Sequence, residues 1–429
     1  MPKPITSGVV VAYAHCPRKA FLLLCTDAPG SPPEYTQMLR QRRNAHRTAY
    51  LTTLKQQNPE AVLYNGQLPR DGRVHLLAAT LRAQDLEADC EALLPVKRQA
   101  PRQKARYEPL LALGTHTASQ DEQLELRFVG SVLAQVQRAP PVAGYLVGLG
   151  GKVTRVSLAK DSTRLGSIIE TLRSWTRDGA PEPPPVILNK HCPECAFRAA
   201  CTAQAEQVDD LSLLDRMTPQ LRQRYHDRGI FSIRQLSYLF NPRRARKHRA
   251  KPAPQHKPEL QALALRTGKT YLHELPNVER RPVELFLDLE GIPDRRQYYL
   301  IGILVSDGDT TSYQGFWADT AEDEATIWHQ ALATFDAYPG APIYHYGSYE
   351  PRAVAALAQR YPSTQGSVMK RLVNVSTSVY GKVYFPVRSN RLKDIGRFLH
   401  VSWTSPDASG LQSLVWRVFD TVIWPRSIR

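Results

Sequence analysis

Residues 283–291 have the sequence Val283-Glu284-Leu285-Phe286-Leu287-Asp288-Leu289-Glu290-Gly291, an apolar run that ends in acids. Its Val, Leu and Phe content predicts a β-strand. Alternation along a strand places Asp288 and Glu290 on the same face. Two carboxylates so close repel each other unless a divalent cation lies between them. The stretch therefore predicts a metal site of the kind that begins two-metal phosphoryl-transfer centres.

The residues around this strand predict an α/β domain over 281–429. Apolar stretches at 298–305 and 341–346 predict further strands, and apolar positions at helical spacing predict helices over 322–338 and 351–361. Glu350 lies where the third strand meets the second helix, so it is a candidate third carboxylate. Two plainer explanations stay open. D-x-E pairs are common, and the helix dipole favours an acid in any first turn.

Four cysteines have the spacing of a cluster or metal site. They are Cys16, Cys192, Cys195 and Cys201. The last three form a C-x2-C-x5-C pattern, and the first lies far upstream in a His-Cys-Pro-Arg-Lys sequence. Four thiolates can hold either an iron–sulfur cluster or a structural zinc ion. Cys25 and Cys90 have no such context, which favours buried, small apolar side chains.

Residues 1–205 predict one α/β unit that contains these cysteines. Apolar patterns predict helices over 13–24 and 36–54, and β-branched and apolar residues predict strands over 107–113 and 152–158.

Residues 206–240 are predicted to be helical. Thr218 is a candidate N-cap before Pro219. Gly229 and Ser232 resemble the turn and cap of a helix-hairpin-helix, which presents backbone N–H groups to phosphates. Any helical hairpin can use glycine and serine in this way, so the contact with phosphate is one of two interpretations.

Basic residues outnumber acidic ones. The chain has 56 Lys and Arg against 40 Asp and Glu, a net charge of +16, which indicates a polyanionic partner and most simply nucleic acid. A merely basic surface is the alternative. A linker is predicted over 241–280, and its basic run favours phosphate contact. That run contains Arg243, Arg244, Arg246, Lys247, Arg249 and Lys251. Arg40, Arg43 and Arg47 recur at helical spacing and form a second candidate patch.

Composition excludes other classes of protein. Apolar residues make up 42% of the chain, which excludes a mainly disordered polypeptide. The longest apolar runs, such as 20–25, are far shorter than the roughly 18 residues needed to cross a membrane. No apolar secretory signal follows the N-terminus. We therefore expect a cytoplasmic protein without a membrane partner.

The C-terminal residues resemble the ribonuclease H-like DEDD exonucleases of the YprB type. The matching stretches are 287–291, 344–351, 384–386, 389–396 and 408–417. The resemblance implies that Asp288 and Glu290 are the first metal-binding pair, that Glu350 is the acid of the second motif, and that Mg²⁺ or Mn²⁺ is the cofactor. The family needs a final acid after Trp416-Arg417 that this tail lacks, and Asp420 is too early to replace it. The chain is therefore expected to be truncated.

The cysteine pattern resembles RecB-like nucleases with an AddB-type iron–sulfur motif. That resemblance implies a restriction-endonuclease-type fold over 1–205, stapled by a [4Fe-4S] cluster. His46 matches the early helical His of that family, and Asp89 is the candidate second member. Leu111 and Leu113 stand where an acid and a Lys would lie, so this second nuclease centre is expected to be degenerate.

Together these features favour a metal-dependent nuclease of the 3'-5' exonuclease type that acts in DNA processing or repair. The implied partners are nucleic acid, with DNA favoured, and a helicase as a candidate. The alternative is a nucleic-acid-binding module that has lost both nuclease centres. A zinc-stapled structural protein is the third hypothesis, and the charge favours it least.

Overall fold

The computed structural model describes residues 3–69, 72–96, 105–160, 162–177, 182–241, 256–278, 280–362, 368–403, 405 and 409–423, without the side chains of 418–423. The chain divides into two compact units, Met1–Ala203 and Gln204–Arg417. All six basic residues predicted at 243–251 lie outside the described residues, as does the side chain of Asp420. Within the described ranges, no helix is long and apolar enough to cross a membrane.

The first unit is built on a seven-stranded mixed sheet. Its strands are β1 (Ile5–Thr6), β2 (Val62–Leu63), β3 (Leu76–Ala83), β4 (Leu86–Pro95), β5 (Tyr107–Ala112), β6 (Ala143–Val147) and β7 (Val153–Ser157). The order is β2-β3-β4-β5-β6-β7, and β1 pairs with β4. β3, β4 and β5 are antiparallel, whereas β6 runs parallel to β5. The strands predicted over 107–113 and 152–158 are confirmed as β5 and β7.

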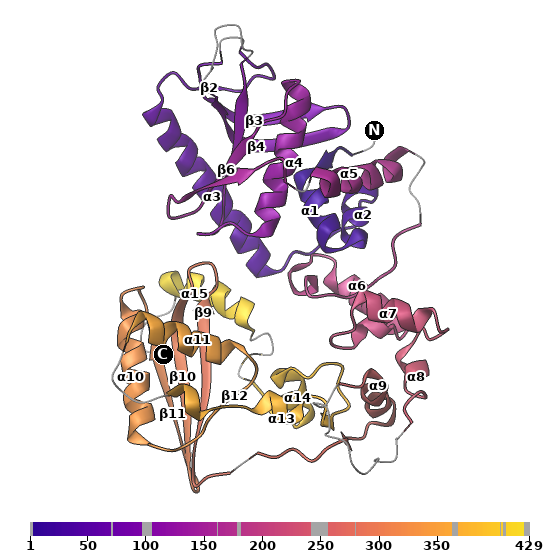
Figure 1. Cartoon of the computed structure of the whole chain (residues 1–429), viewed down its shortest axis with the longest axis vertical. Helices are drawn as coiled ribbons and strands as arrows, with labels where there is room; N and C mark the ends of the chain where they lie inside the picture. Colours follow the sequence, from indigo (N-terminus) through magenta and orange to yellow (C-terminus); the bar gives the residue numbers. More distant parts are fainter. Residues whose placement is uncertain are drawn as a thin grey trace. The chain divides into compact units, whose positions relative to one another are not determined.

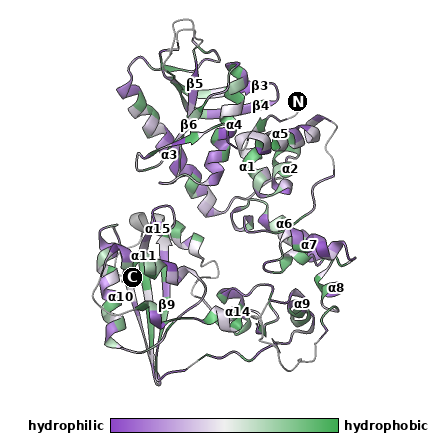
Figure 2. Cartoon of the chain, viewed as in Figure 1, coloured by the Kyte–Doolittle hydropathy of each residue, from purple (hydrophilic) through white to green (hydrophobic). Residues whose placement is uncertain are grey.

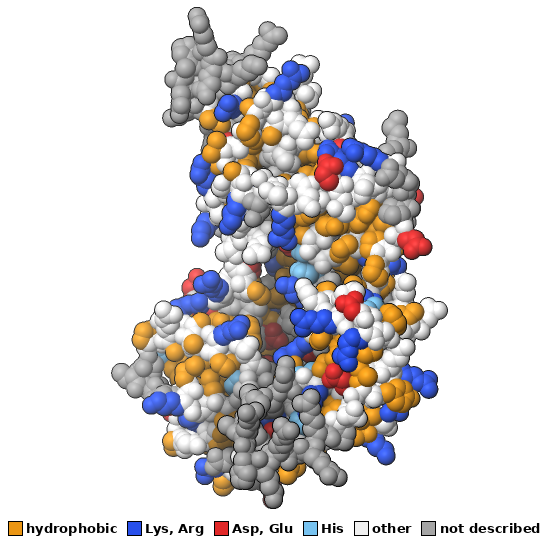
Figure 3. Space-filling view, turned by 45° about the vertical axis from the view of Figure 1, so that its right-hand side comes forward, with side chains coloured by type: hydrophobic (Ala, Val, Ile, Leu, Met, Phe, Trp, Pro, Cys, Tyr) orange, Lys and Arg blue, Asp and Glu red, His pale blue; other side chains and the backbone are white. Residues whose placement is uncertain are grey.

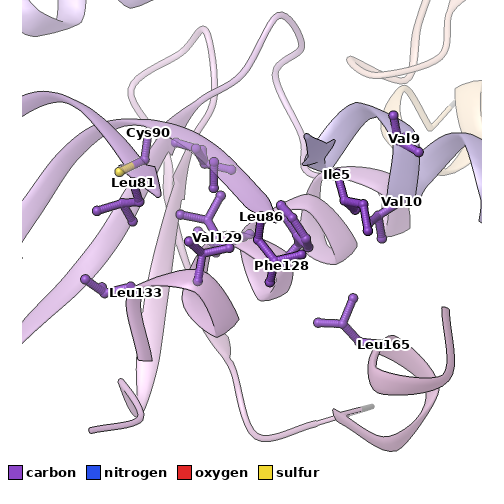
Figure 4. Packing of buried hydrophobic residues seen from close by; sticks show 14 of the residues in the cluster. Ile5, Val9, Val10, Leu81, Leu86, Cys90, Phe128, Val129, Leu133 and Leu165 are labelled. Carbon is purple, nitrogen blue, oxygen red and sulfur yellow. The ribbon is translucent and has the colours of Figure 1, made fainter. Parts of the chain in front are cut away.

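Helices cover both faces of this sheet. They are α1 (Ser7–His15), α2 (Pro17–Cys25), α3 (Glu34–Gln57), α4 (Gln120–Val136) and α5 (Ser162–Arg177). α1 and α4 pack over the larger apolar cluster, in which Phe128, Val129 and Leu86 are buried (Figure 4). α3 packs through residues such as Leu54 over a smaller cluster. Most of α3 is hydrophilic (Figure 2), and Met38 and Leu54 are its buried residues.

The helix predicted over 13–24 is wrong in one respect, because it is two helices that meet at Cys16. Cys16 has an extended backbone, with φ −164° and ψ 112°, and it is the N-cap of α2. Pro17 at the first position has no N–H for a preceding turn, so the helix restarts there. Cys16 therefore lies between two helices and not within one. The helix predicted over 36–54 is confirmed as part of α3.

Short helices begin the second unit. They are α6 (Arg198–Gln207), which crosses the boundary between the units, the 3-10 turn η2 (Leu211–Leu213), α7 (Pro219–His226), α8 (Ile233–Leu236) and α9 (Pro258–Thr267). Thr218 caps α7 through its hydroxyl, as predicted, and Ser232 forms a capping box at α8. The predicted linker over 241–280 contains α9 and also β8 (Tyr271–Leu272), which pairs with β14 (Val383–Tyr384).

A five-stranded sheet forms the centre of the C-terminal part. It contains β9 (Val283–Ile292), β10 (Gln297–Asp307), β11 (Thr310–Trp317), β12 (Ile343–His345) and β13 (Leu372–Asn374) in the order β11-β10-β9-β12-β13 (Figure 1). The first three strands are antiparallel, β12 is parallel to β9, and β13 is parallel to β12. The strands predicted at 283–291, 298–305 and 341–346 are thereby confirmed.

Two long helices cover one face of this sheet. α10 (Asp323–Ala337) and α11 (Tyr349–Arg360) share an apolar core with Leu285, Leu287 and Leu289 of β9. The remaining helices are α12 (Val368–Arg371), α13 (Val375–Val379), α14 (Leu392–Phe398) and α15 (Gly410–Ile423). The core on the α10 and α11 side leaves the opposite face of β9 for polar side chains.

Candidate functional site

The two acids of β9 lie on the face of the sheet opposite α10 and α11. Because Leu287 and Leu289 are buried in the core, alternation directs Asp288 and Glu290 away from it. Asp288 is exposed and Glu290 is half-buried. The two carboxylates therefore share one face, as the alternation predicted.

Glu350 lies at the same edge of the sheet. β12 ends at His345 and α11 begins at Tyr349, so Glu350 is in the first turn of the helix. Because β12 runs parallel to β9, the carboxyl ends of both strands meet at one edge. Glu350 is 7% exposed, and its Oε2 has no hydrogen-bond partner among the described residues. Nδ1 of His345 lies 3.5 Å from this oxygen.

The three carboxyls influence one another. Burial raises the pKa of each above its ordinary value. The charge of Asp288 further raises the pKa of Glu290 and of Glu350, whereas Lys393 lowers the pKa of Asp288 and of Glu290. These effects together raise the pKa of Glu290 to about 7. A cation among the three would favour their ionised forms.

Three neighbours of these acids were not predicted from the sequence. Ser413, in α15, hydrogen-bonds to Glu290 and accepts a hydrogen bond of 2.9 Å from the hydroxyl of Tyr299. Lys393 lies in the first turn of α14. Lys393 and Ser413 belong to the stretches 389–396 and 408–417, whose family resemblance was the signal available. Tyr299 had no such signal, because only the packing of distant elements brings it to the acids.

The oxygen donors suit Mg²⁺ or Mn²⁺, which prefer carboxylate and water ligands. The buried, unpaired Oε2 of Glu350 also fits a cation, because an unpaired buried carboxylate oxygen is otherwise costly. The side chains are nevertheless spread apart. Across the part of the chain that the structure describes, no group of three or more His, Cys, Asp or Glu has the arrangement of a metal site.

Comparison with known families identifies this part of the chain. Residues 285–419 match the model of the ribonuclease H superfamily. The match begins within β9 and includes all three acids, so the C-terminal part is a ribonuclease H-like domain. That class of domain processes nucleic acid by nuclease-type chemistry and typically uses divalent metal ions. No curated protein matches the chain.

The four predicted cysteines line one pocket of the first unit. Cys16 comes from the start of α2, Cys192 and Cys195 from the 3-10 turn η1 (Cys192–Glu194) and its end, and Cys201 from α6. All are half-buried free thiols. Burial raises the pKa of Cys192 and of Cys201, and nearby cysteines raise both further. The pocket therefore joins residues almost 200 positions apart in the sequence.

Two further contacts involve residues that line this pocket. The backbone N–H of Asn189 donates to Sγ of Cys192 over 3.2 Å. The rings of His15 and His191 stack with centroids 3.8 Å apart. Cys90, by contrast, is buried in the apolar core, as its lack of context predicted.

The residues of the predicted degenerate centre make separate contacts in the first unit. His46 donates from Nδ1 to the carbonyl of Leu113 over 2.8 Å. Asp89 is exposed on β4 and accepts a hydrogen bond of 2.6 Å from the hydroxyl of Thr80. Leu111 and Leu113 are completely buried, so neither offers a group for a cation.

A buried acid that the sequence analysis missed, Glu91, lies between two of the predicted phosphate-binding arginines. It accepts a hydrogen bond of 2.7 Å from the backbone N–H of Ala112, and Nε of Arg47 lies 3.5 Å from its Oε1. Arg43 donates two hydrogen bonds of 2.9 Å to Glu125. Arg43 and Arg47 therefore pair with carboxylates, and phosphate contact by this patch stays a prediction. The sequence signal for a buried Glu91 was its position as the single acid in the apolar run 90–94.

Basic side chains are nevertheless common on the surface. Figure 3 shows more Lys and Arg than Asp and Glu side chains on the face in view. This agrees with the net charge of +16. A positive surface attracts nucleic acid without selecting a sequence.

Proposed function

We propose that the chain is a metal-dependent nuclease that hydrolyses phosphodiester bonds from a 3' end, with DNA as the favoured substrate. Asp288, Glu290 and Glu350 would hold Mg²⁺ or Mn²⁺. The observation that carries the proposal is the position of these three carboxylates at one edge of a ribonuclease H-like sheet. The carboxylates repel one another, and a divalent cation bound between them would offset this repulsion.

When bound, such an ion supplies an activated water and offsets the charge that develops on the phosphate. The chain's own residues would position the substrate. Lys393 places a positive charge near Asp288 and Glu290, where a phosphate would otherwise be repelled. Phe286 and Tyr313 are exposed near Asp288 and offer rings on which an unpaired base can stack.

We further propose that the four cysteines of the first unit hold a [4Fe-4S] cluster. The support is that they line a single pocket, which the break at Cys16 helps to form. The unit would then be RecB-like, which the order α3, β3–β5, α4, β6 supports. Bound as a staple, the cluster would tie the N-terminal helices to the segment around Cys192.

The alternative is a nucleic-acid-binding module without activity. The observation that favours it is the burial of Leu111 and Leu113, since a first nuclease centre cannot operate with these residues. The acids of β9 favour activity in the second centre. The experiment below separates the two functions because it measures binding and cleavage independently.

The test uses end-labelled single-stranded DNA and RNA with anaerobically purified protein. Binding is measured in EDTA, and cleavage is measured in Mn²⁺ or Mg²⁺. We expect Asp288→Asn to reduce cleavage by at least about 100-fold, because a lost ligand misplaces the ion. Glu322→Gln, an exposed acid just before α10, is the matched control. Retained binding with no cleavage by the wild-type protein would overturn the nuclease proposal and leave the binding module.

A further inference from the structure

A second pocket lies in the C-terminal unit. It has a volume of about 440 Å³, within the range of pockets that hold small ligands. We call it the arginine pocket. Its polar and aromatic lining includes Arg216, Tyr346, Ser376, Tyr380, Asn390 and Arg391.

Chain connections place this pocket at the edge of the sheet where the acids lie. Gly347 lines it, in the short connection between β12 and α11 whose first turn holds Glu350. Ser376 lines it shortly after β13, which is parallel to β12. Arg391 lines it two residues before Lys393, whose charge acts on Asp288 and Glu290. A ligand that extends from the arginine pocket along this edge would therefore reach the acids.

The lining has the chemistry of a nucleotide-binding site. Arg216 and Arg391 supply two guanidinium groups, which recognise phosphate oxygens through paired N–H donors. Tyr346 supplies a ring on which a base can stack. Asp215 adds one opposing negative charge, so the charged side chains of the pocket still favour an anion.

Several contacts hold these groups in place before any ligand binds. The guanidinium of Arg216 lies 4.0 Å from the ring centroid of Tyr380, and that ring stacks on His256 at 4.8 Å. The hydroxyl of Tyr346 donates to the carbonyl of Asn390 over 2.6 Å. Arg216 has φ +58°, a conformation that is strained for a side chain of this size. Strain of this kind is found where function requires a fixed side-chain direction.

One polar atom of the pocket wall lacks a partner. Oδ1 of Asn390 is buried, and no donor within the described ranges reaches it. A buried acceptor without a donor is unfavourable unless a ligand or water supplies the hydrogen bond. An amino or hydroxyl group of a nucleotide is a donor of the required kind.

We propose that the arginine pocket is a nucleotide subsite, which binds one nucleotide of a single strand next to the nucleotide being cleaved. Arg216 and Arg391 contact its phosphate, Tyr346 contacts its base, and Asn390 accepts a hydrogen bond from it. The proposal rests on the proposed function, because it takes nucleic acid as the substrate. It adds a set of residues outside the acidic centre that determines where the strand lies.

The test is binding of a fluorescently labelled 12-nucleotide single-stranded DNA, followed by anisotropy in EDTA so that cleavage cannot occur. The Arg216→Ala, Arg391→Ala double variant should bind on the order of tenfold more weakly and show a shallower salt dependence. The control is Arg352→Ala, Arg397→Ala, which removes two exposed arginines outside the pocket. A second pocket variant, Tyr346→Leu, should weaken binding without changing the salt dependence.

Far-ultraviolet circular dichroism establishes that each variant is folded. Equal binding by the arginine double variant and its control overturns the subsite, whatever the cleavage assay shows. Weaker binding by the pocket variants supports it. If those variants bind weakly while the wild-type protein does not cleave in Mn²⁺, the subsite stands and the nuclease proposal fails.

Discussion

Glu290→Gln should stabilise the C-terminal domain when no metal ion is present. Glu290 lies half-buried beside Asp288, and both carboxylates are ionised at alkaline pH only at a cost to the fold. Glutamine has nearly the same size and accepts a hydrogen bond from Ser413 as the carboxylate does. The substitution therefore removes charge while it keeps the packing.

The magnitude follows from the pKa of this group. It is about 7 in the folded protein, against 4.5 for an ordinary glutamate. Each pKa unit corresponds to about 1.4 kcal/mol, so ionisation lowers the free energy of unfolding by up to about 3 kcal/mol. Remaining solvent contact screens part of this, which leaves roughly 1.5–3 kcal/mol.

The sign of the pH dependence follows from proton binding. Between about pH 4.5 and pH 7 the folded state holds a proton that the unfolded state releases, so stability falls as the pH rises. The loss of unfolding free energy caused by ionised Glu290 is complete above about pH 7 and absent below about pH 4.5. Glu290→Gln should therefore stabilise the domain most at about pH 8 and hardly at about pH 4.5.

The assay is urea denaturation in EDTA at both pH values, with hydrogen exchange of peptides from β9 to follow this domain. Glu322→Gln is the matched control, with no expected change. Mn²⁺ should stabilise the wild-type protein and much less the Glu290→Gln variant, because the cation binds the folded carboxylates. Equal stability of variant and wild type at pH 8, or equal stabilisation at both pH values, would refute the reasoning.

Three further outcomes are expected. Asp210→Asn should lower the free energy of unfolding by about 3 kcal/mol in urea, because it leaves the guanidinium of Arg222 buried without its carboxylate; the added Arg222→Met should recover part of the loss. Gly148→Ala should lower the midpoint of thermal unfolding, at a cost of about 1–3 kcal/mol, because its Cβ would lie 2.3 Å from a backbone oxygen. Gly166→Ala, in open space on α5, should instead raise that midpoint. Cys192→Ser should remove bound iron and the absorbance near about 400 nm from anaerobically purified protein, and unchanged iron content would contradict the cluster.

Local patterns predicted much of the ribonuclease H-like domain. The apolar content and length of 283–291 identified β9, and period-two alternation placed Asp288 and Glu290 on one face. The junction of a strand and a helix located Glu350. These predictions hold because strand and helix periodicity depend on neighbouring residues alone.

Contacts between distant segments were beyond such patterns. Alternation places Asp89 and Glu91 on the same face of β4. It did not reveal that only Glu91 is buried, because the groups that contact Glu91, Ala112 and Arg47, come from other elements. Arg43 was predicted to face phosphate, but it pairs with Glu125, which is 82 residues away. The partner of a charged side chain depends on which elements pack together, and helical spacing does not specify that.

The sequence by itself determined the type of most elements and the shared face of the two β9 acids. It also predicted that Cys16 belongs to one site with the cysteines around Cys192. Only the tertiary structure decided that four cysteines line one pocket, that Lys393 and Ser413 adjoin the acids, and that Arg216 and Arg391 face a common cavity. The physical reason is that backbone periodicity is local. The position of one element beside another is set by the burial of apolar faces along the whole chain.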